Sequence, residues 1–315
     1  MKHNRQILND ALYYFFSKLF PGIFGLLFIF IFTRLIGIVE YGQYSLLHSK
    51  INLIISFGFG WLNQSTLRYG NSLKEKNNHI TFLTICILLI SLLTIVLKII
   101  EGFTYNNFLL ILFCIASMGC LSFFKTFYQS KLLPRNVFLL VNIQSFFSLL
   151  LPLFFFANGI LSAKILLFCV GLSSLISIYI VLLLKKELSL FNSFNCRIKK
   201  NQIKKWLKFG VPVSIWSCMG LLLPYLDRFY INKFLNPELL GAYSSINELT
   251  LRIFSFIIFP FTMALHPRIV KLWNSNKKIE SFLVVVKSVK VVIAFLLICL
   301  VILFFFDNEI FIVIK

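Results

Sequence analysis

The sequence predicts an all-α protein, a polytopic bundle of membrane-spanning helices, and three observations support this prediction. Hydrophobic residues make up 59% of the 315-residue chain and charged residues only 13%, whereas a water-soluble chain carries roughly a quarter charged residues. The mean hydropathy is +0.88. Apolar runs of about 20 residues, the length of a helix that crosses a bilayer, recur along the whole chain. Lipid is therefore the expected surrounding of most of the surface.

The apolar runs predict nine transmembrane helices. We place them near residues 11–33, 44–64, 80–100, 105–124, 137–157, 160–184, 208–230, 243–264 and 281–306. The longest and most basic connection, between the sixth and seventh runs, separates six expected helices from three. It predicts an N-terminal six-helix half over residues 1–185, a basic cytoplasmic linker over 186–207, and a partial C-terminal half of three helices over 208–315.

The distribution of basic residues predicts the orientation of the chain. Twenty Lys and Arg residues fall in the connections on one side of the expected membrane and five in those on the other. By the positive-inside rule the basic side, which includes the N-terminus, is cytoplasmic. A net charge of +20 otherwise suggests nucleic acid as a partner. Here the basic residues lie between apolar runs and not on a soluble domain, so no nucleic-acid binding is expected.

The sequence gives no sign of a metal site or of an enzyme. Its seven cysteines and four histidines are scattered without metal-ligand spacing, so neither a metal nor another cofactor is expected. We find no glycine-rich phosphate loop, no acidic pair in a sizeable loop, and no nucleophile with a plausible base. The first apolar run is longer than a signal-peptide core and no small-residue cleavage site follows it, so no cleaved signal peptide is expected.

An internal repeat links the two expected halves. At an offset of 199 residues "FTRLIGIVEYGQYSLL" (32–47) falls on "INKFLNPELLGAYSSI" (231–246), so that Gly42 matches Gly241 and Ser45 matches Ser244. Both copies occupy the outer turn between the first and second helices of a half. The helices that follow each carry one polar stripe at helical spacing. The stripes are Ser45, His48, Ser49, Asn52 and Ser56 in one helix, and Ser244, Glu248, Arg252 and Ser255 in the other.

Arg252 is the most informative member of these stripes. It lies about nine residues from the outer end of its expected span, near the bilayer midplane, where a charge costs about 2.5–3.5 kcal/mol on insertion scales. Glu248, one turn away, is expected to pair with it. Two interpretations remain open: a purely structural ion pair that ties helices together, or a polar cavity between the two striped helices in which Arg252 meets an anionic group. Asp227 and Arg228 are expected to form an interfacial pair.

The sequence also resembles a known family. The segments that carry the resemblance are "FTRLIGIVEYGQYSL" (32–46), "GWLNQSTLRYG" (60–70), "LKFGVPVSIW" (207–216), "LDRFYINKFLNPELLGAYSS" (226–245) and "ALHPRIVKLW" (264–273). They are similar to the polysaccharide-biosynthesis flippases of the Wzx type, which belong to the superfamily of lipid II flippases and of multidrug and toxin extruders (MATE). The resemblance covers essentially the whole chain.

The resemblance implies two six-helix halves around a central cavity, in the cytoplasmic membrane of a bacterium. It implies that undecaprenyl-diphosphate-linked oligosaccharide crosses the membrane by alternating access, with a polysaccharide polymerase or ligase as a further partner. Carried over to this sequence, the substrate-binding residues are Arg252 with Glu248, then Arg68 and Lys18, and His48, Ser49 and Asn52 as hydrogen-bonding groups for sugar. A proton or sodium gradient is the expected driving force, with Glu248 or His48 as the coupling group.

This chain departs from the family pattern because only three helices are expected in its second half. Self-association is one way to complete the bundle, and an inactive truncated remnant is one alternative to a flippase. Two others are a drug or cation antiporter of the same fold and a membrane-embedded glycan polymerase or glycosyltransferase. The antiporter would favour acidic residues in the cavity, and the enzyme would need a larger outer loop than the connections of about ten residues found here.

Overall fold

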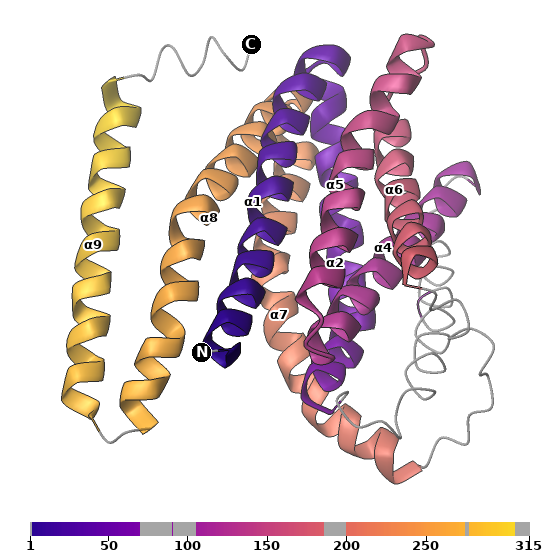
Figure 1. Cartoon of the computed structure of the whole chain (residues 1–315). Coiled ribbons are helices and arrows are strands. Elements are labelled where there is room, and N and C mark those ends of the chain that lie inside the picture. Colours follow the sequence, from indigo (N-terminus) through magenta and orange to yellow (C-terminus); the bar gives the residue numbers. More distant parts are fainter. Residues whose placement is uncertain (1, 70–89, 91–104, 186–199, 275–276, 306–315) are drawn as a thin grey trace.

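In a computed structural model the chain is entirely helical over the residues that the structure describes, which are 2–69, 90, 105–185, 200–274 and 277–305. Eight helices lie in this part of the chain (Figure 1). They are α1 (Lys2–Ile36), α2 (Ile38–Tyr69), α4 (Tyr105–Ser130), α5 (Pro134–Ala157), α6 (Ala163–Leu184), α7 (Lys200–Phe234), α8 (Pro237–Asn274) and α9 (Lys278–Phe305). The prediction of an all-α fold is confirmed.

The expected spans correspond to these helices in all but one case. The span at 80–100 lies outside the described residues apart from Ile90. Each of the other eight ranges overlaps one helix, and most of these helices extend several residues beyond the expected range. Five described segments are long and apolar enough to cross a membrane, namely Phe15–Ile36, Phe108–Ser130, Pro134–Ala157, Ala163–Leu184 and Ile203–Phe234. The protein is a multi-pass membrane protein, while the number of nine spans stays a prediction.

Local sequence signals set the helix boundaries. Gly37 separates α1 from α2 with a φ of 82°, a conformation that glycine adopts without the steric cost of a Cβ. Pro134 and Pro237 each stand at the start of a helix, where the missing N–H of proline costs no hydrogen bond. The last residues of the basic linker predicted over 186–207 belong to α7, which begins at Lys200.

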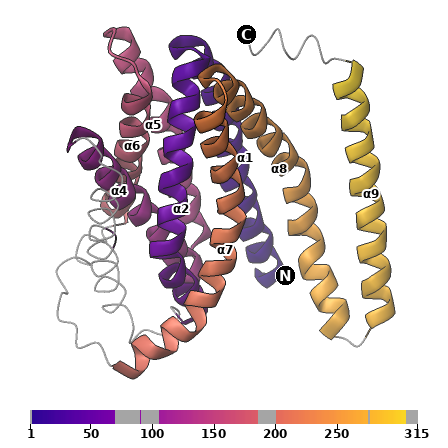
Figure 2. The same ribbon diagram turned by 180° about the vertical axis from the view of Figure 1, so that it is seen from behind.

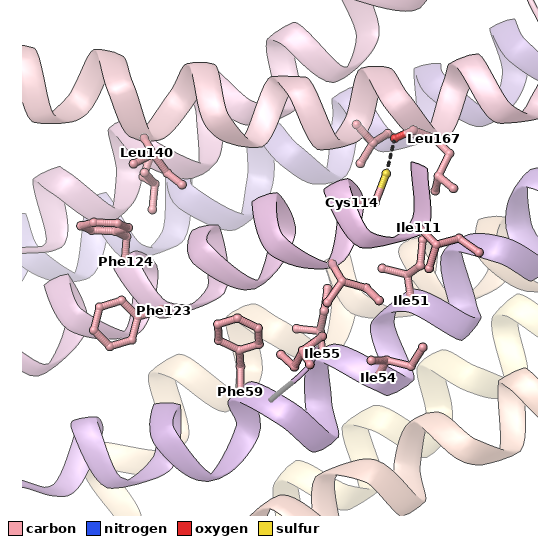
Figure 3. Packing of buried hydrophobic residues seen from close by; sticks show 14 of the residues in the cluster. Ile51, Ile54, Ile55, Phe59, Ile111, Cys114, Phe123, Phe124, Leu140 and Leu167 are labelled. Atoms are coloured by element: carbon pink, nitrogen blue, oxygen red, sulfur yellow. Dashed lines mark hydrogen bonds between the residues drawn. The ribbon is translucent and has the colours of Figure 1, made fainter. Parts of the chain in front are cut away.

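The core of the bundle lies between α2, α4, α5 and α6. Ile51, Ile55 and Phe59 of α2 pack toward α4 (Figure 3), where Ile111 and Cys114 are buried. The Cys114 thiol donates a hydrogen bond to the Leu167 carbonyl of α6 at 3.4 Å. A buried cysteine of this kind packs as a small apolar residue.

The first and second parts of the chain meet along α2 and α7, which run antiparallel. Gln43 donates to Asn232 at 3.0 Å near one end, and the Ser65 hydroxyl donates to the Trp206 carbonyl at 2.8 Å near the other. Between them the Ser214 hydroxyl donates to the Ser56 carbonyl at 2.9 Å. Three polar contacts spread along the helices therefore hold α7 against α2 over nearly its whole length.

The α1–α2 and α7–α8 turns lie at the same end of the bundle, which we call the turn end (Gly37 and 235–236). From there α7 and α8 diverge toward the opposite end (Figures 1 and 2), where Tyr69 ends α2. The last described helix, α9, lies beside α8 (Figure 2) and contacts it. The described helices are thus held together most closely at the turn end.

Candidate functional site

The two polar stripes predicted from the sequence meet directly at the turn end. Glycines make the close approach possible: a Cβ added to Gly241 would overlap the Ile38 carbonyl, and one added to Gly42 would lie 2.7 Å from the Gly241 nitrogen. Small residues at such crossings let membrane helices approach backbone to backbone. Gly42 and Gly241 are also equivalent positions of the internal repeat in the sequence.

The carboxylate of Glu248 is the centre of a hydrogen-bond network at this crossing. It accepts hydrogen bonds from the Tyr41 hydroxyl at 2.8 Å and from the Ser45 hydroxyl at 2.5 Å. It also forms an ion pair with Arg228 of α7 at 3.3 Å. The expectation that Glu248 pairs with Arg252 is therefore wrong. The reason is that α2 and α7 both pack against α8 at this level and supply three donors to one carboxylate.

Arg228 is the buried cation of this network. Its side chain is only 5% exposed, and its guanidinium donates to Ser49 at 2.8 Å and to the Pro224 carbonyl at 3.3 Å, besides Glu248. A buried ion pair is tolerated only when further hydrogen bonds satisfy the remaining donors and acceptors. The expected interfacial pair of Asp227 with Arg228 is not formed, because Asp227 accepts from the Tyr243 hydroxyl at 2.8 Å.

Arg228 could have been found from the sequence by its position in the α7–α8 hairpin. Residues equally far from the turn at 235–236 come to the same level in antiparallel helices. This places Arg228 beside Ser244, which its guanidinium contacts at 3.4 Å. Glu248 follows Ser244 by one helical turn, within reach of a long arginine side chain. The i, i+4 spacing within α8 indicates Arg252 as the partner of Glu248 and carries no signal for a partner across the turn.

Arg252 occupies a different place from the one expected for an ion pair. It is half-buried, and its guanidinium lies against α1 where Gly25 leaves room for it, since a Cβ at Gly25 would overlap the side chain. It lies within electrostatic reach of Tyr44 and His48. Among the residues that the structure describes, no carboxylate pairs with it. Gly25 was not identified from the sequence, because only the packing of α1 on α8 gives it a role.

His48 and Asn52 lie together on α2. The His48 ring stacks on Tyr44 with 5.6 Å between ring centroids, and the Asn52 amide nitrogen lies 3.3 Å from His48 Nδ1. Ser49 is instead engaged at the ion pair, where it receives Arg228 and donates to the Ser45 carbonyl at 2.8 Å. Of the three residues predicted to bind sugar by hydrogen bonds, His48 and Asn52 therefore lie on the side of Arg252, whereas Ser49 contacts Arg228.

Arg68 and Lys18 are not part of this group. Arg68 is 16 residues beyond Asn52 on α2, about 24 Å away along the helix, and its guanidinium lies over the Phe209 ring at 4.2 Å from the centroid. Lys18 of α1 is exposed and within electrostatic reach of Lys125 of α4. The predicted polar cavity between α2 and α8 is also absent at the level of Glu248, where the side chains of the two helices bond directly.

Similarity to known proteins agrees with this picture of apolar helices with a few buried charges. A protein-family model described as "Polysaccharide biosynthesis protein" matches residues 7–273. The chain belongs to this family, whose members are generally transporter-like membrane proteins. No curated protein and no solved structure matches the chain. The match spans both polar stripes and every residue of the sites described above, so the family resemblance noted from the sequence is confirmed.

Proposed function

We propose that this protein is a flippase, which moves undecaprenyl-diphosphate-linked oligosaccharide units across the bacterial cytoplasmic membrane for surface polysaccharide synthesis. Membership of the polysaccharide biosynthesis family and the apolar helices support a membrane step in this pathway. The observation that carries the proposal is the guanidinium of Arg252, deep along α8 and without a carboxylate partner among the described residues.

The chemistry of Arg252 favours a diphosphate as its partner. A cation near the bilayer midplane is costly and faces a protein interior or a water-filled space. Guanidinium binds phosphate oxygens through two parallel hydrogen bonds, a geometry that matches the planar fork of arginine. His48 and Asn52 lie nearby with hydrogen-bonding groups suited to sugar hydroxyls. We therefore assign the diphosphate to Arg252 and the first sugars to the α2 side of the site.

In this proposal the described conformation is open toward the cytoplasm. The turn end is closed by the Gly42–Gly241 crossing and by the Arg228–Glu248 pair, while α7 and α8 diverge toward the opposite end. The positive-inside pattern assigns that opposite end to the cytoplasm. Substrate enters there and binds Arg252. Release on the far side requires the contacts at the turn end to separate, while the opposite end closes.

The buried pair gives a route for ion coupling within the same proposal. Protonation of Glu248 would remove its charge and so weaken its attraction for Arg228, which favours opening of the turn end. The same pair argues against an extruder of organic cations. Such a transporter needs an acidic group free to meet its substrate, whereas Glu248 is neutralised by Arg228 and receives two hydroxyl groups.

The proposal is tested by reconstitution of the full chain into liposomes that contain a fluorescent undecaprenyl-diphosphate oligosaccharide. A reagent outside the vesicles that quenches the outer label reports transfer between leaflets. We expect transfer with the wild-type protein, loss of transfer with Arg252→Ala, and partial transfer with Arg252→Lys, which keeps the charge but not the planar fork. Transfer that is unchanged in Arg252→Ala, or uptake of an organic cation in its place, would contradict the proposal.

A further inference from the structure

A groove on the outer side of α7 has no role in the proposed transport site. It consists of two hollows that adjoin at Leu207. One is shallow and open, and is lined by Ile203, Lys204, Leu207 and Lys208 of α7. The other has a volume of about 400 Å³ and is lined mainly by apolar side chains of α2 and α7, among them Trp61, Leu207 and Val211, with Ile90 as a further wall. The first hollow has a basic rim, and the second is almost wholly apolar.

The spacing of the α7 residues explains why the two hollows form one groove. Leu207, Val211 and Ile215 recur every four residues and therefore lie on one face of the helix. They are 38%, 37% and 50% exposed, so this face is open to the surroundings of the bundle. Lys204 and Lys208 border the same face at its N-terminal end. A basic mouth thus leads into an apolar groove that runs along the helix.

The length of the groove matches one leaflet of a bilayer. From Lys204 to Ile215 the helix rises about 16 Å, and half of a hydrocarbon core of about 30 Å is about 15 Å. Lys204 and Lys208 are expected near the level where lipid headgroups meet the hydrocarbon, because the span expected from the sequence begins at residue 208. A ligand that fills the groove is therefore an amphiphile with an ordinary acyl chain and a headgroup near the two lysines.

The charge of the mouth selects the type of headgroup. Arg68 and Lys205 lie farther round α7 at the same end, both beside Tyr69: the Arg68 guanidinium is 4.2 Å from the Phe209 centroid and the Lys205 ammonium is 4.4 Å from the Tyr69 centroid. Four cations thus gather at one helix end. In the part of the chain that the structure describes, none of them is paired with a carboxylate. Clusters of basic residues at the membrane surface attract anionic lipids.

The two walls of the groove that α2 and α7 form are held in place without a ligand. The Ser65 hydroxyl fixes the Trp206 carbonyl at 2.8 Å, and the Ser214 hydroxyl fixes the Ser56 carbonyl at 2.9 Å. Between these bonds a Cβ at Gly210 would overlap the Trp61 carbonyl, so the two helices touch closely at this level. Binding into a preformed groove requires little ordering of the protein.

We propose that this groove is a binding site for one anionic phospholipid of the surrounding leaflet. The phosphate lies between Lys204 and Lys208, and one acyl chain follows Leu207, Val211 and Ile215. The occupant is a phospholipid and not the lipid-linked substrate, because the groove is one leaflet long and a long polyprenyl chain would exceed it. The site is also separate from Arg252, which lies between α8 and α1.

The test is native mass spectrometry of the full-length protein, released from detergent with phosphatidylglycerol or with phosphatidylcholine of the same acyl chains. We expect one retained phosphatidylglycerol and weaker retention of the zwitterionic lipid. The variant Lys204→Gln/Lys208→Gln should weaken retention about 25-fold, since each lysine strengthens binding to an anionic surface about fivefold. The matched control Lys287→Gln/Lys290→Gln removes two exposed lysines of α9 and should retain the lipid as the wild type does.

A second variant tests the apolar part of the groove. Val211→Trp fills the second hollow and should displace both lipids, while an unchanged melting temperature shows that the fold is intact. Three results would overturn the proposal: equal retention by the wild type and the lysine variant, equal retention of the two lipids, or retention of a polyprenyl diphosphate that phosphatidylglycerol does not displace. None of these results bears on the transport role of Arg252, so the two proposals fail separately.

Discussion

Arg228 and Arg252 belong to the same helical hairpin, yet their surroundings are opposite. Arg228 is buried, paired with Glu248, and hydrogen-bonded to α2. Arg252 is half-buried, lies against Gly25, and has no carboxylate partner in the described part of the chain. A satisfied buried charge serves structure, whereas an unsatisfied charge inside a membrane protein marks a place for a ligand. The difference distinguishes a contact that closes the turn end from the residue that we propose to bind the substrate.

The largest expected effect is on export through Arg252. Arg252→Ala removes the side chain that we propose to bind the diphosphate. It should abolish export of surface glycan, while the amount of protein in the membrane stays unchanged. Surface glycan and membrane-inserted protein are measured in cells that depend on this chain. The control Lys233→Ala removes an exposed basic residue from the end of α7 and should have little effect. Normal glycan with Arg252→Ala would show that the free guanidinium is not the binding group.

The next effect concerns the buried pair. Glu248→Gln leaves Arg228 without its counter-charge and should destabilise the protein by about 3–5 kcal/mol, the usual cost of breaking a buried ion pair. The double variant Arg228→Gln/Glu248→Gln removes both charges and should recover part of this loss. Thermal melting in detergent measures both. If the loss of stability in the double variant equals the sum of the losses in Glu248→Gln and Arg228→Gln, the two residues do not act as a pair.

These charges also show what the sequence could and could not predict. The helices follow from apolar runs, and the stripes of α2 and α8 follow from polar residues three or four positions apart, so both could be predicted from the sequence. The partner of Glu248 could not be read in the same way, because it depends on the axial level at which α7 returns beside α8. The role of Gly25 depends on the packing of α1 against α8, and no periodic pattern in the sequence indicates this packing.

A smaller effect is expected at the glycine crossing. Gly241→Ala places a Cβ into the Ile38 carbonyl, so the helices must move apart, and overpacking of this kind costs about 1–3 kcal/mol. Gly220→Ala is the matched control in the neighbouring helix α7, since a Cβ there meets nothing within 4 Å. We expect a lower melting temperature for the first variant and no decrease for the second. Equal melting temperatures would mean that the turn end is packed more loosely than described.

The smallest expected effect is at Arg68. Arg68→Gln removes a cation that rests on Phe209 at an exposed position, so the melting temperature should hardly change. The initial rate of glycan export should fall only modestly, because other basic residues remain at the same end of the bundle. A loss of export as complete as that of Arg252→Ala would place the essential phosphate contact at Arg68, at the end of the bundle opposite to the turn end, and would contradict the role proposed for Arg252.

The most direct test of the central claim is the leaflet distribution of lipid-linked oligosaccharide in cells that lack the gene. It is measured again after the wild-type chain or the Arg252→Ala variant is restored at equal levels in the membrane. The account predicts accumulation on the cytoplasmic face, relief by the wild-type chain, and no relief by the variant. An unchanged distribution after deletion, or equal relief by both proteins, would contradict it.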